Sequence, residues 1–255
     1  MHILVTNDDG VSAPGLLALA QALRTIGKVS VVAPDRNWSA SGHVKTLHRP
    51  LRVKSVHLAD GSEALASDGA PSDCVALALM GLLTEPVDLV VSGINPNANL
   101  GHDVTYSGTV TAAMEGAISG VPSIAISLDV SEDLKEPPDF STAARVASRI
   151  TARVLHHQLP TGVILNINVP YRQEENLAGY AVTRQGLRIY RDELVKRSDP
   201  RGKPYYWIGG EAPTGIPDEG TDIGALARGF VSITPLSLDL TAYTAIEPLT
   251  RWQWS

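Results

Sequence analysis

Two adjacent carboxylates follow a short apolar run at the start of the chain, where Ile3-Leu4-Val5-Thr6-Asn7-Asp8-Asp9-Gly10 is typical of a strand that ends in an acidic turn. Neighbouring carboxylates repel each other, so solvent, a basic partner or a cation has to offset their charge. Hard divalent cations take oxygen ligands, and Mg²⁺ commonly binds through one or two carboxylates plus a substrate phosphate. Asp8 and Asp9 are therefore candidate metal ligands, although Asn, Asp and Gly also favour an ordinary turn.

The elements after this turn indicate an α/β sheet. Residues 14–26 are predicted to form a helix, because Leu and Ala recur at helical spacing and Pro14 suits a first turn. Residues 29–34 predict a second strand, parallel to the first. Ligands of such sheets bind beyond the carboxyl ends of the strands, where the acidic turn falls. Because G-x-G-x-x-G is missing from this turn, NAD binding is not expected.

A polar loop, Asp35 to His43, leaves the second strand at the same predicted edge of the sheet. The hydroxyl of Ser39 is a candidate metal ligand, while Arg36 and His43 are candidates for contact with a phosphate. Each also has an ordinary interpretation, as a turn or cap residue, a solvated charge and a core or surface imidazole respectively. Taken singly, these ordinary interpretations are favoured.

A third strand, residues 88–92, leads into a loop with three Asn and two Gly and then into Ser107-Gly108-Thr109 at the start of a helix. Free backbone N–H groups, hydroxyls and the positive end of the helix dipole make such a start a natural phosphate cradle. A simple N-cap by Ser107 or Thr109 explains one residue, but it does not explain the preceding loop of amides.

Further along the chain, alternating apolar patterns and turn residues predict additional elements. Residues 191–204 are charged and predict a mobile arm. The other expected elements are a flanking hairpin (51–56 and 63–66), a helix beginning near 69–75, a strand (123–128), a long helix (139–159), a strand (163–170), an extended segment (180–188), a short helix capped by 220–222, and a last strand (229–236).

Length and composition bound the class of protein. With 255 residues and 44% hydrophobic residues, we expect a single α/β domain, its core formed by about 1–170 plus 221–236, with extensions at about 178–220 and 237–255. A net charge of −6 without a long basic block argues against nucleic acid as a partner. The lone Cys74 excludes an intramolecular disulfide and is typical of a small buried residue.

The termini carry two further signals. No basic segment followed by an apolar stretch opens the chain, and no window approaches 18 apolar residues, so we expect a cytoplasmic protein without a membrane partner. The tail Arg251-Trp252-Gln253-Trp254 is aromatic in a chain with few aromatic residues, which indicates an oligomer interface.

Taken together, these residues resemble the SurE family of stationary-phase survival proteins, which are metal-dependent 5′-nucleotidases. The resemblance spans nearly the whole chain, and its motifs occur in the family's order. They are residues 4–10, 33–37 with Ser39, 69–75, 92–95, 99–101, 106–110, 166–170 and 229–236.

This resemblance implies one divalent cation per subunit, Mg²⁺ or Mn²⁺, and a phosphate beside it. The implied metal ligands are all oxygen donors: Asp8, Asp9, Ser39 and Asn95. The implied phosphate-binding residues are Asn99, Ser107, Gly108 and Thr109. The family fold is a Rossmann-like, mostly parallel sheet with helices on both faces, plus an extended C-terminal oligomerisation arm that is swapped in a homodimer or homotetramer.

Two positions depart from the family pattern. Asn97 stands where the family usually has Gly, and Asn tolerates the left-handed conformation better than most residues. Trp38 stands where polar residues are common, and it suits stacking on a base as well as packing within its loop. Arg36, Trp38 and His43 are therefore the candidate substrate pocket, and neither departure affects an implied ligand.

The resulting hypothesis is hydrolysis of a nucleoside 5′-monophosphate to nucleoside and phosphate by metal-assisted attack of water. Asp8 or Asp9 is the candidate catalytic residue that orients or deprotonates the water. A phospho-aspartate intermediate is a rival mechanism. Two other functions stay open: a phosphatase acting mainly on short polyphosphate or other phosphomonoesters, and a nucleotide sensor without turnover.

Overall fold

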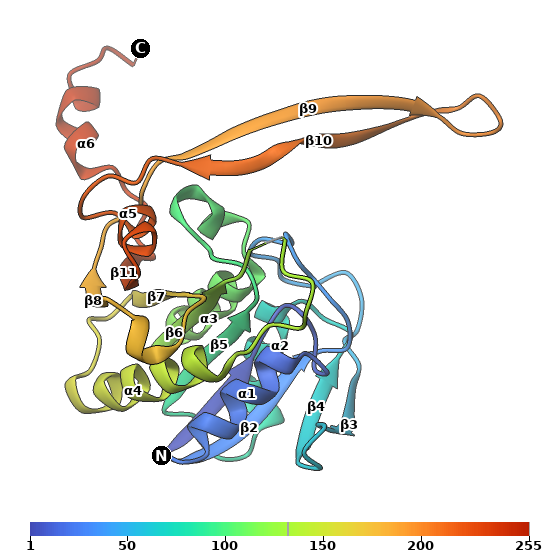
Figure 1. Cartoon of the computed structure of the whole chain (residues 1–255), viewed down its shortest axis with the longest axis vertical. Coiled ribbons are helices and arrows are strands. Elements are labelled where there is room, and N and C mark those ends of the chain that lie inside the picture. Colours follow the sequence, from blue (N-terminus) through green and yellow to red (C-terminus); the bar gives the residue numbers. More distant parts are fainter. Residues whose placement is uncertain (132, 255) are drawn as a thin grey trace.

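The structure is a computed structural model that describes residues 1–131 and 133–254, and a nine-stranded sheet runs through its centre (Figure 1). The strands lie side by side in the order β3-β4-β2-β1-β5-β6-β7-β11-β8. β3 and β11 run antiparallel to their neighbours β4 and β7, and the remaining pairs are parallel. The strands are β1 (His2–Thr6), β2 (Lys28–Pro34), β3 (Val53–His57), β4 (Glu63–Ser67), β5 (Leu89–Asn95), β6 (Ser123–Asp129), β7 (Val163–Pro170), β8 (Gly179–Val182) and β11 (Phe230–Ser237).

The order of the strands reverses at β1. Its partner on one side is β2, the next strand in the chain, and its partner on the other side is β5. In open α/β sheets, this reversal opens a crevice at the carboxyl ends of the strands, and ligands bind there. The acidic turn that follows β1 therefore lies at the switch point of the sheet.

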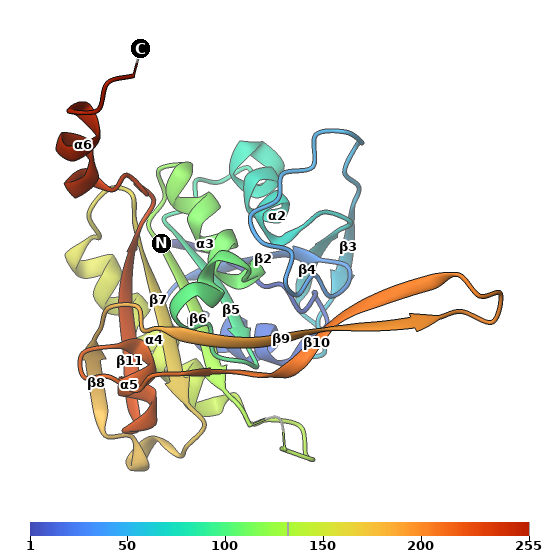
Figure 2. The same cartoon turned by 90° about the horizontal axis from the view of Figure 1, so that it is seen from above.

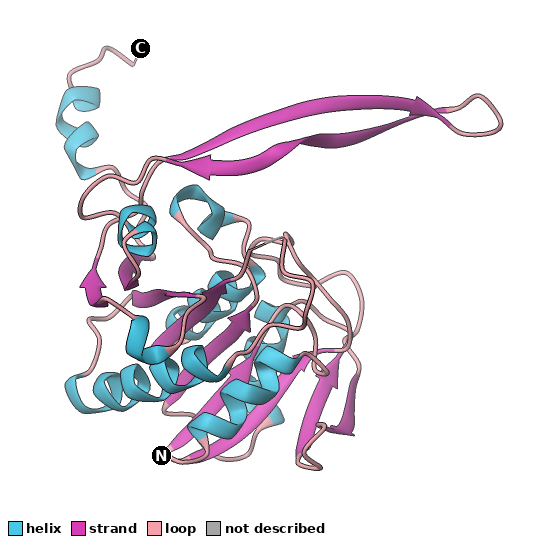
Figure 3. Ribbon diagram, viewed as in Figure 1, coloured by secondary structure: helices cyan, strands magenta, loops and turns pink. Residues whose placement is uncertain are grey.

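Helices cover both faces of the sheet, which confirms the predicted α/β class (Figure 3). On one face, α1 (Pro14–Leu23) packs beside α4 (Ser141–His157). On the other face, α2 (Pro71–Leu77), which continues into the π-helical turn η1 (Ala78–Leu82), packs beside α3 (Gly108–Ile118). The predicted helix 14–26 was too long, because residues 24–26 leave the helix in a turn.

The edges of the sheet also match the sequence patterns. β3 and β4 form the predicted flanking hairpin, and β11 is the predicted last strand. The short helix α5 (Asp222–Ala227) begins where it was expected, with the Thr221 hydroxyl accepting a hydrogen bond from Gly224 N at 3.0 Å. Two 3₁₀ turns complete the body, η2 (Gly101–Thr105) and η3 (Glu174–Asn176).

A two-stranded ribbon, β9 (Arg188–Ser198) and β10 (Pro204–Gly215), projects far from the body of the molecule (Figure 2). The predicted arm over 191–204 lies in this ribbon, where residues 191–198 pair with 204–211 in an antiparallel ladder. A helix that was not predicted, α6 (Tyr243–Thr250), projects in a different direction from the ribbon. Among the described residues, no helix has both the length and the apolar character of a membrane span.

Candidate functional site

The acidic turn places two carboxylates side by side in a largely buried position. Asp8 is only 4% exposed, and neither Asp8 nor Asp9 forms an ion pair with another residue in the described part of the chain. Burial raises the pKa of Asp8, and hydrogen bonds from Thr109 and nearby backbone groups oppose this shift. Burial, followed by repulsion from Asp8, raises the pKa of Asp9 to about 7. Hydrogen bonds offset part of the electrostatic cost of this pair, but within the described chain no cationic side chain neutralises it.

The start of α3 lies directly against this turn. The Thr109 hydroxyl donates a hydrogen bond to Asp8 Oδ1 at 2.5 Å. A Cβ atom at Gly108 would lie 2.7 Å from the Asp8 Cβ, so glycine is required for this close approach. The Ser107 hydroxyl is the N-cap and accepts from Val110 N at 3.1 Å. The helix start predicted to hold phosphate thus also holds one of the predicted metal ligands.

The loop after β2 is hydrogen-bonded to the acidic turn. Trp38 N donates to the backbone oxygen of Asp8 at 2.7 Å. The Asn37 side chain bridges the two segments, because its Nδ2 lies 3.4 Å from Asp9 Oδ1 and its Oδ1 accepts from Ser39 N at 2.8 Å. Ser39 is therefore held close to Asp9 through Asn37. This role of Asn37 was not predicted from the sequence, although its place between Arg36 and Ser39 was the available signal.

Asn95 ends β5, the other neighbour of β1. Its Nδ2 donates to the backbone oxygen of Asn97 at 2.5 Å, so its Oδ1 is the atom left for a ligand. Across the described residues, no group of three or more His, Cys, Asp or Glu side chains is arranged to hold a metal. The predicted set of two carboxylates, one hydroxyl and one amide oxygen nevertheless fits a hard cation, whose charge would offset that of the carboxylate pair.

Asn99 is fixed by a buried polar network. Its backbone N donates to Asn168 Oδ1 at 2.7 Å, and its backbone oxygen accepts from Asn166 Nδ2 at 2.8 Å. Its own side-chain Nδ2 donates to Ser127 Oγ at 2.8 Å. These partners lie on β6 and β7, so the sheet holds the loop of amides in place.

The three candidate substrate-pocket residues do not line one cavity. Arg36 and Trp38 line an open hollow of about 520 Å³, with the guanidinium 6.0 Å from the centre of the indole ring. His43 instead pairs with the buried Glu115 at 3.0 Å and lines a separate, mainly apolar cavity of about 790 Å³. The structure therefore places His43 apart from the other two.

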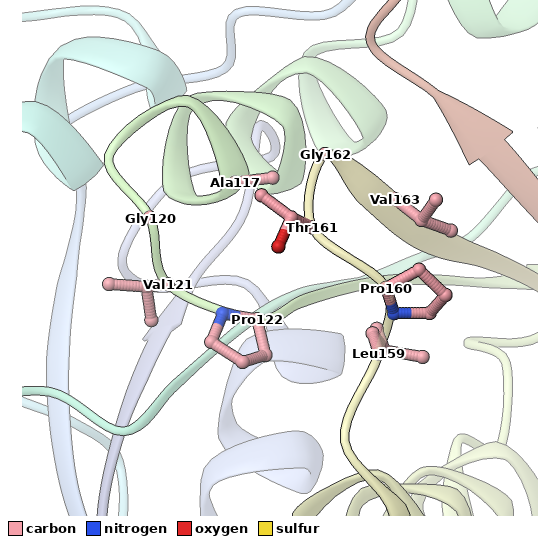
Figure 4. A pocket seen from close by; sticks show the side chains of 9 residues that line it. All are labelled: Ala117, Gly120, Val121, Pro122, Leu159, Pro160, Thr161, Gly162 and Val163. Atoms are coloured by element: carbon pink, nitrogen blue, oxygen red, sulfur yellow. The ribbon is translucent and has the colours of Figure 1, made fainter.

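A pocket of about 90 Å³ lies at the opposite edge of the sheet, around the segments that lead into β6 and β7 (Figure 4). Thr161 supplies its only polar side chain, and its other lining residues are Ala117, Gly120, Val121, Pro122, Leu159, Pro160, Gly162 and Val163. Without a charged or nucleophilic cluster, this pocket offers no chemistry that competes with the acidic turn.

Comparison with known proteins gives a consistent result. The family model described as "Survival protein SurE" matches residues 3–192. The 5′-nucleotidase SurE of Herpetosiphon aurantiacus is 57% identical over 255 residues, covering 100% of this chain and 99% of the relative. That of Chloroflexus aggregans is 53% identical over 254 residues, with 100% of both chains covered. The crystal structure of the SurE protein from Aquifex aeolicus superimposes with a TM-score of 0.82 at 42% identity, covering 98% of each chain.

Proposed function

The chain belongs to the SurE family, and we propose that this 5′-nucleotidase is a divalent-metal-dependent phosphatase that hydrolyses nucleoside 5′-monophosphates to nucleoside and phosphate. The observation that carries the proposal is the pair Asp8 and Asp9 at the switch point of the sheet. Asp8 is buried directly against the start of α3, Asp9 is half-buried, and the two carboxylates repel each other. Asp8, Asp9, Ser39 and Asn95 would hold one cation, Mg²⁺ or Mn²⁺, whose charge would relieve this repulsion.

A second group of residues is proposed to bind the substrate phosphate. Ser107, Gly108 and Thr109 present hydroxyl and backbone N–H donors of a helix start, which stabilise charge that develops on phosphoryl oxygens. Asn99 completes the phosphate-binding set from a loop that the sheet holds rigid. A bound divalent cation supplies positive charge for the phosphoryl group and acidifies water beside it.

Asp9 is our candidate for the group that accepts a proton from the attacking water. Asp9 is the more exposed of the two carboxylates, so a water molecule can reach it. Asp8 is less suited, because the Thr109 hydroxyl already occupies its Oδ1. Trapping a labelled phospho-enzyme would overturn this direct attack of water in favour of a phospho-aspartate.

The hollow lined by Arg36 and Trp38 is our candidate site for the nucleoside. Its indole ring offers a stacking surface for a base, and it lies in the loop that holds Ser39 near Asp9. His43 has its own partner in Glu115, so we assign it no contact with the nucleoside.

We further propose that the protein is a homodimer or homotetramer. Large apolar side chains are exposed on the ribbon and in the C-terminal segment, including Leu194, Trp207, Ile208, Trp252 and Trp254. Exposed apolar surface of this kind marks an interaction site more often than a free surface. Light scattering coupled to size-exclusion chromatography tests this proposal, and a mass of 27.1 kDa across the accessible concentration range would reject it.

The experiment for the activity is phosphate release from 5′-AMP and 5′-GMP, with Mg²⁺ or Mn²⁺ and with EDTA. Short polyphosphate and p-nitrophenyl phosphate are run beside the nucleotides. We expect release from the nucleotides that requires metal and stops with EDTA. Faster release from polyphosphate than from either nucleotide would identify the broader phosphatase instead. Nucleotide binding without release under any metal would identify a sensor.

A further inference from the structure

The 3₁₀ turn η2 (Gly101–Thr105) joins the two segments that are proposed to hold phosphate. Asn99 precedes this turn and Ser107 follows it. η2 contributes none of the proposed ligands, but its position sets the spacing between them. Long-range hydrogen bonds connect it to the base of the β9–β10 ribbon and to the start of α5.

The first connection runs through Gly101. Its backbone N donates to Asp222 Oδ2 at 2.8 Å, and its backbone oxygen accepts from Gln185 Nε2 at 2.8 Å. Gly101 has φ of +51°, and a Cβ atom there would lie 2.4 Å from the backbone oxygen of Gly186. The first residue of η2 is therefore locked against the segment that leads into β9.

The second connection runs through Asp103. The first strand of the ribbon provides both partners: Arg188 Nε donates to Asp103 Oδ2 at 2.6 Å, and the Tyr190 hydroxyl donates to Asp103 Oδ1 at 2.6 Å. The side chains of Arg188 and Asp103 are only 16% and 18% exposed. Exposed ion pairs contribute little to stability. A partly buried carboxylate whose two oxygens both accept hydrogen bonds is, in contrast, held firmly in one orientation.

We propose that Arg188, Tyr190 and Asp103 form a positioning clamp through which the base of the ribbon holds η2, and with it Asn99 and Ser107, in the geometry that binds the substrate phosphate. This inference rests on the proposed function. None of the three residues belongs to the proposed metal or phosphate ligands, so we assign all three a positioning role. The clamp gives the ribbon a role in the phosphate site in addition to any role in assembly.

The test compares Arg188→Gln with a matched control, Arg191→Gln. Arg191 lies on the same strand, but its partners Glu211 and Thr214 belong to the ribbon itself. For the full chain with Mn²⁺, kcat and KM for 5′-AMP and Ki for inorganic phosphate are measured. The affinity for Mn²⁺ without substrate is measured by calorimetry.

For Arg188→Gln we expect KM and the phosphate Ki to rise about tenfold, because small misplacements of binding groups are costly. The Mn²⁺ affinity should stay near that of wild type, since all the proposed metal ligands lie outside the segment 99–107 that the clamp holds. Arg191→Gln should leave all of these values near wild type. Arg188→Lys, which keeps the charge, should recover part of the loss.

Two outcomes would overturn the clamp. One is an unchanged phosphate Ki in Arg188→Gln, and the other is an equal rise in Arg191→Gln, which would indicate general weakening of the ribbon. If Arg188→Gln does not fold, Tyr190→Phe removes one bond to Asp103 and should raise the phosphate Ki in the same direction. If the wild type releases no phosphate from 5′-AMP, the proposed function fails, whereas phosphate affinity by calorimetry still tests the clamp.

Discussion

Two buried aspartates meet the first turn of a helix in this fold, and their surroundings differ. Asp222 is fully buried at the start of α5, where its oxygens accept hydrogen bonds from the backbone N of Gly101, Gly186 and Ile223. Asp8 reaches the start of α3 from the turn after β1. It receives the Thr109 hydroxyl, and its chain neighbour is a second carboxylate.

The difference separates a structural aspartate from a proposed metal ligand. The fold itself satisfies Asp222, so that carboxylate has no need of a ligand. The fold leaves the Asp8–Asp9 pair with repulsion and raised pKa values, which a cation would relieve. Both helices use a hydroxyl N-cap, Ser107 in α3 and Thr221 in α5, so the cap alone does not distinguish them.

Replacing Asp8 gives the largest expected change in activity. Asp8→Asn should lower metal-dependent phosphate release from 5′-AMP more than about 100-fold. Replacing a residue that only orients a metal ligand costs up to about 100-fold, and Asp8 is a proposed direct ligand. Its thermal midpoint without metal should equal or exceed that of wild type, since one of two repelling carboxylates is removed. Activity within about tenfold of that of wild type would contradict the assigned role of Asp8.

Replacing Asp222 should instead act on stability. Asp222→Asn turns an NH₂ group toward backbone donors, so the free energy of unfolding should fall by about 2–3 kcal/mol. Urea unfolding followed by circular dichroism measures this loss. A stable Asp222→Asn protein together with an unfolded Asp8→Asn protein would reverse the comparison.

Thr109 tests whether the Asp8 carboxylate must be oriented. Thr109→Val removes the hydroxyl that donates to Asp8 Oδ1 and should weaken Mn²⁺ affinity about tenfold. Thr109→Ser keeps the hydroxyl and serves as the matched control. Calorimetric titration with Mn²⁺ decides the result, and equal affinities in the two variants would show that this hydrogen bond does not matter.

The carboxylate pair also predicts a pH dependence. The pKa of Asp9 is raised from 3.8 to about 7 in the folded state, so folded protein binds this proton more tightly than unfolded protein. Without metal, stability from Asp9 is present below about pH 4 and is lost as pH rises to about 7. Thermal midpoints of wild type and Asp9→Asn should therefore diverge over this range, with the variant more stable at neutral pH. Parallel curves would exclude this shift.

The smallest expected effects come from the two caps. Ser107→Ala and Thr221→Ala should each lower the free energy of unfolding by about 1 kcal/mol, because each removes an N-cap acceptor. Only Ser107→Ala should also raise the Ki for inorganic phosphate. An equal effect of both variants on this Ki would remove Ser107 from the phosphate site.

Local sequence patterns were sufficient for most of the elements. The strand before Asp8, the helix after Pro14 and the last strand 229–236 all form where apolar spacing and turn residues predicted them. Such patterns depend on neighbours within one or two turns of chain, so the sequence carries them directly. The acidic turn at the carboxyl edge follows from the same reasoning.

The pairings across the chain were decided only by the tertiary structure. Thr109 meets Asp8 over a separation of 101 residues, and Asp222 meets Gly101 over a separation of 121 residues. Residues 191–198 form one strand of a ribbon because residues 204–211 pair beside them. Periodicity says which side of an element is apolar, but not which strands become neighbours. The sequence therefore determined which groups are available for chemistry, and the order of the sheet decided which of them meet.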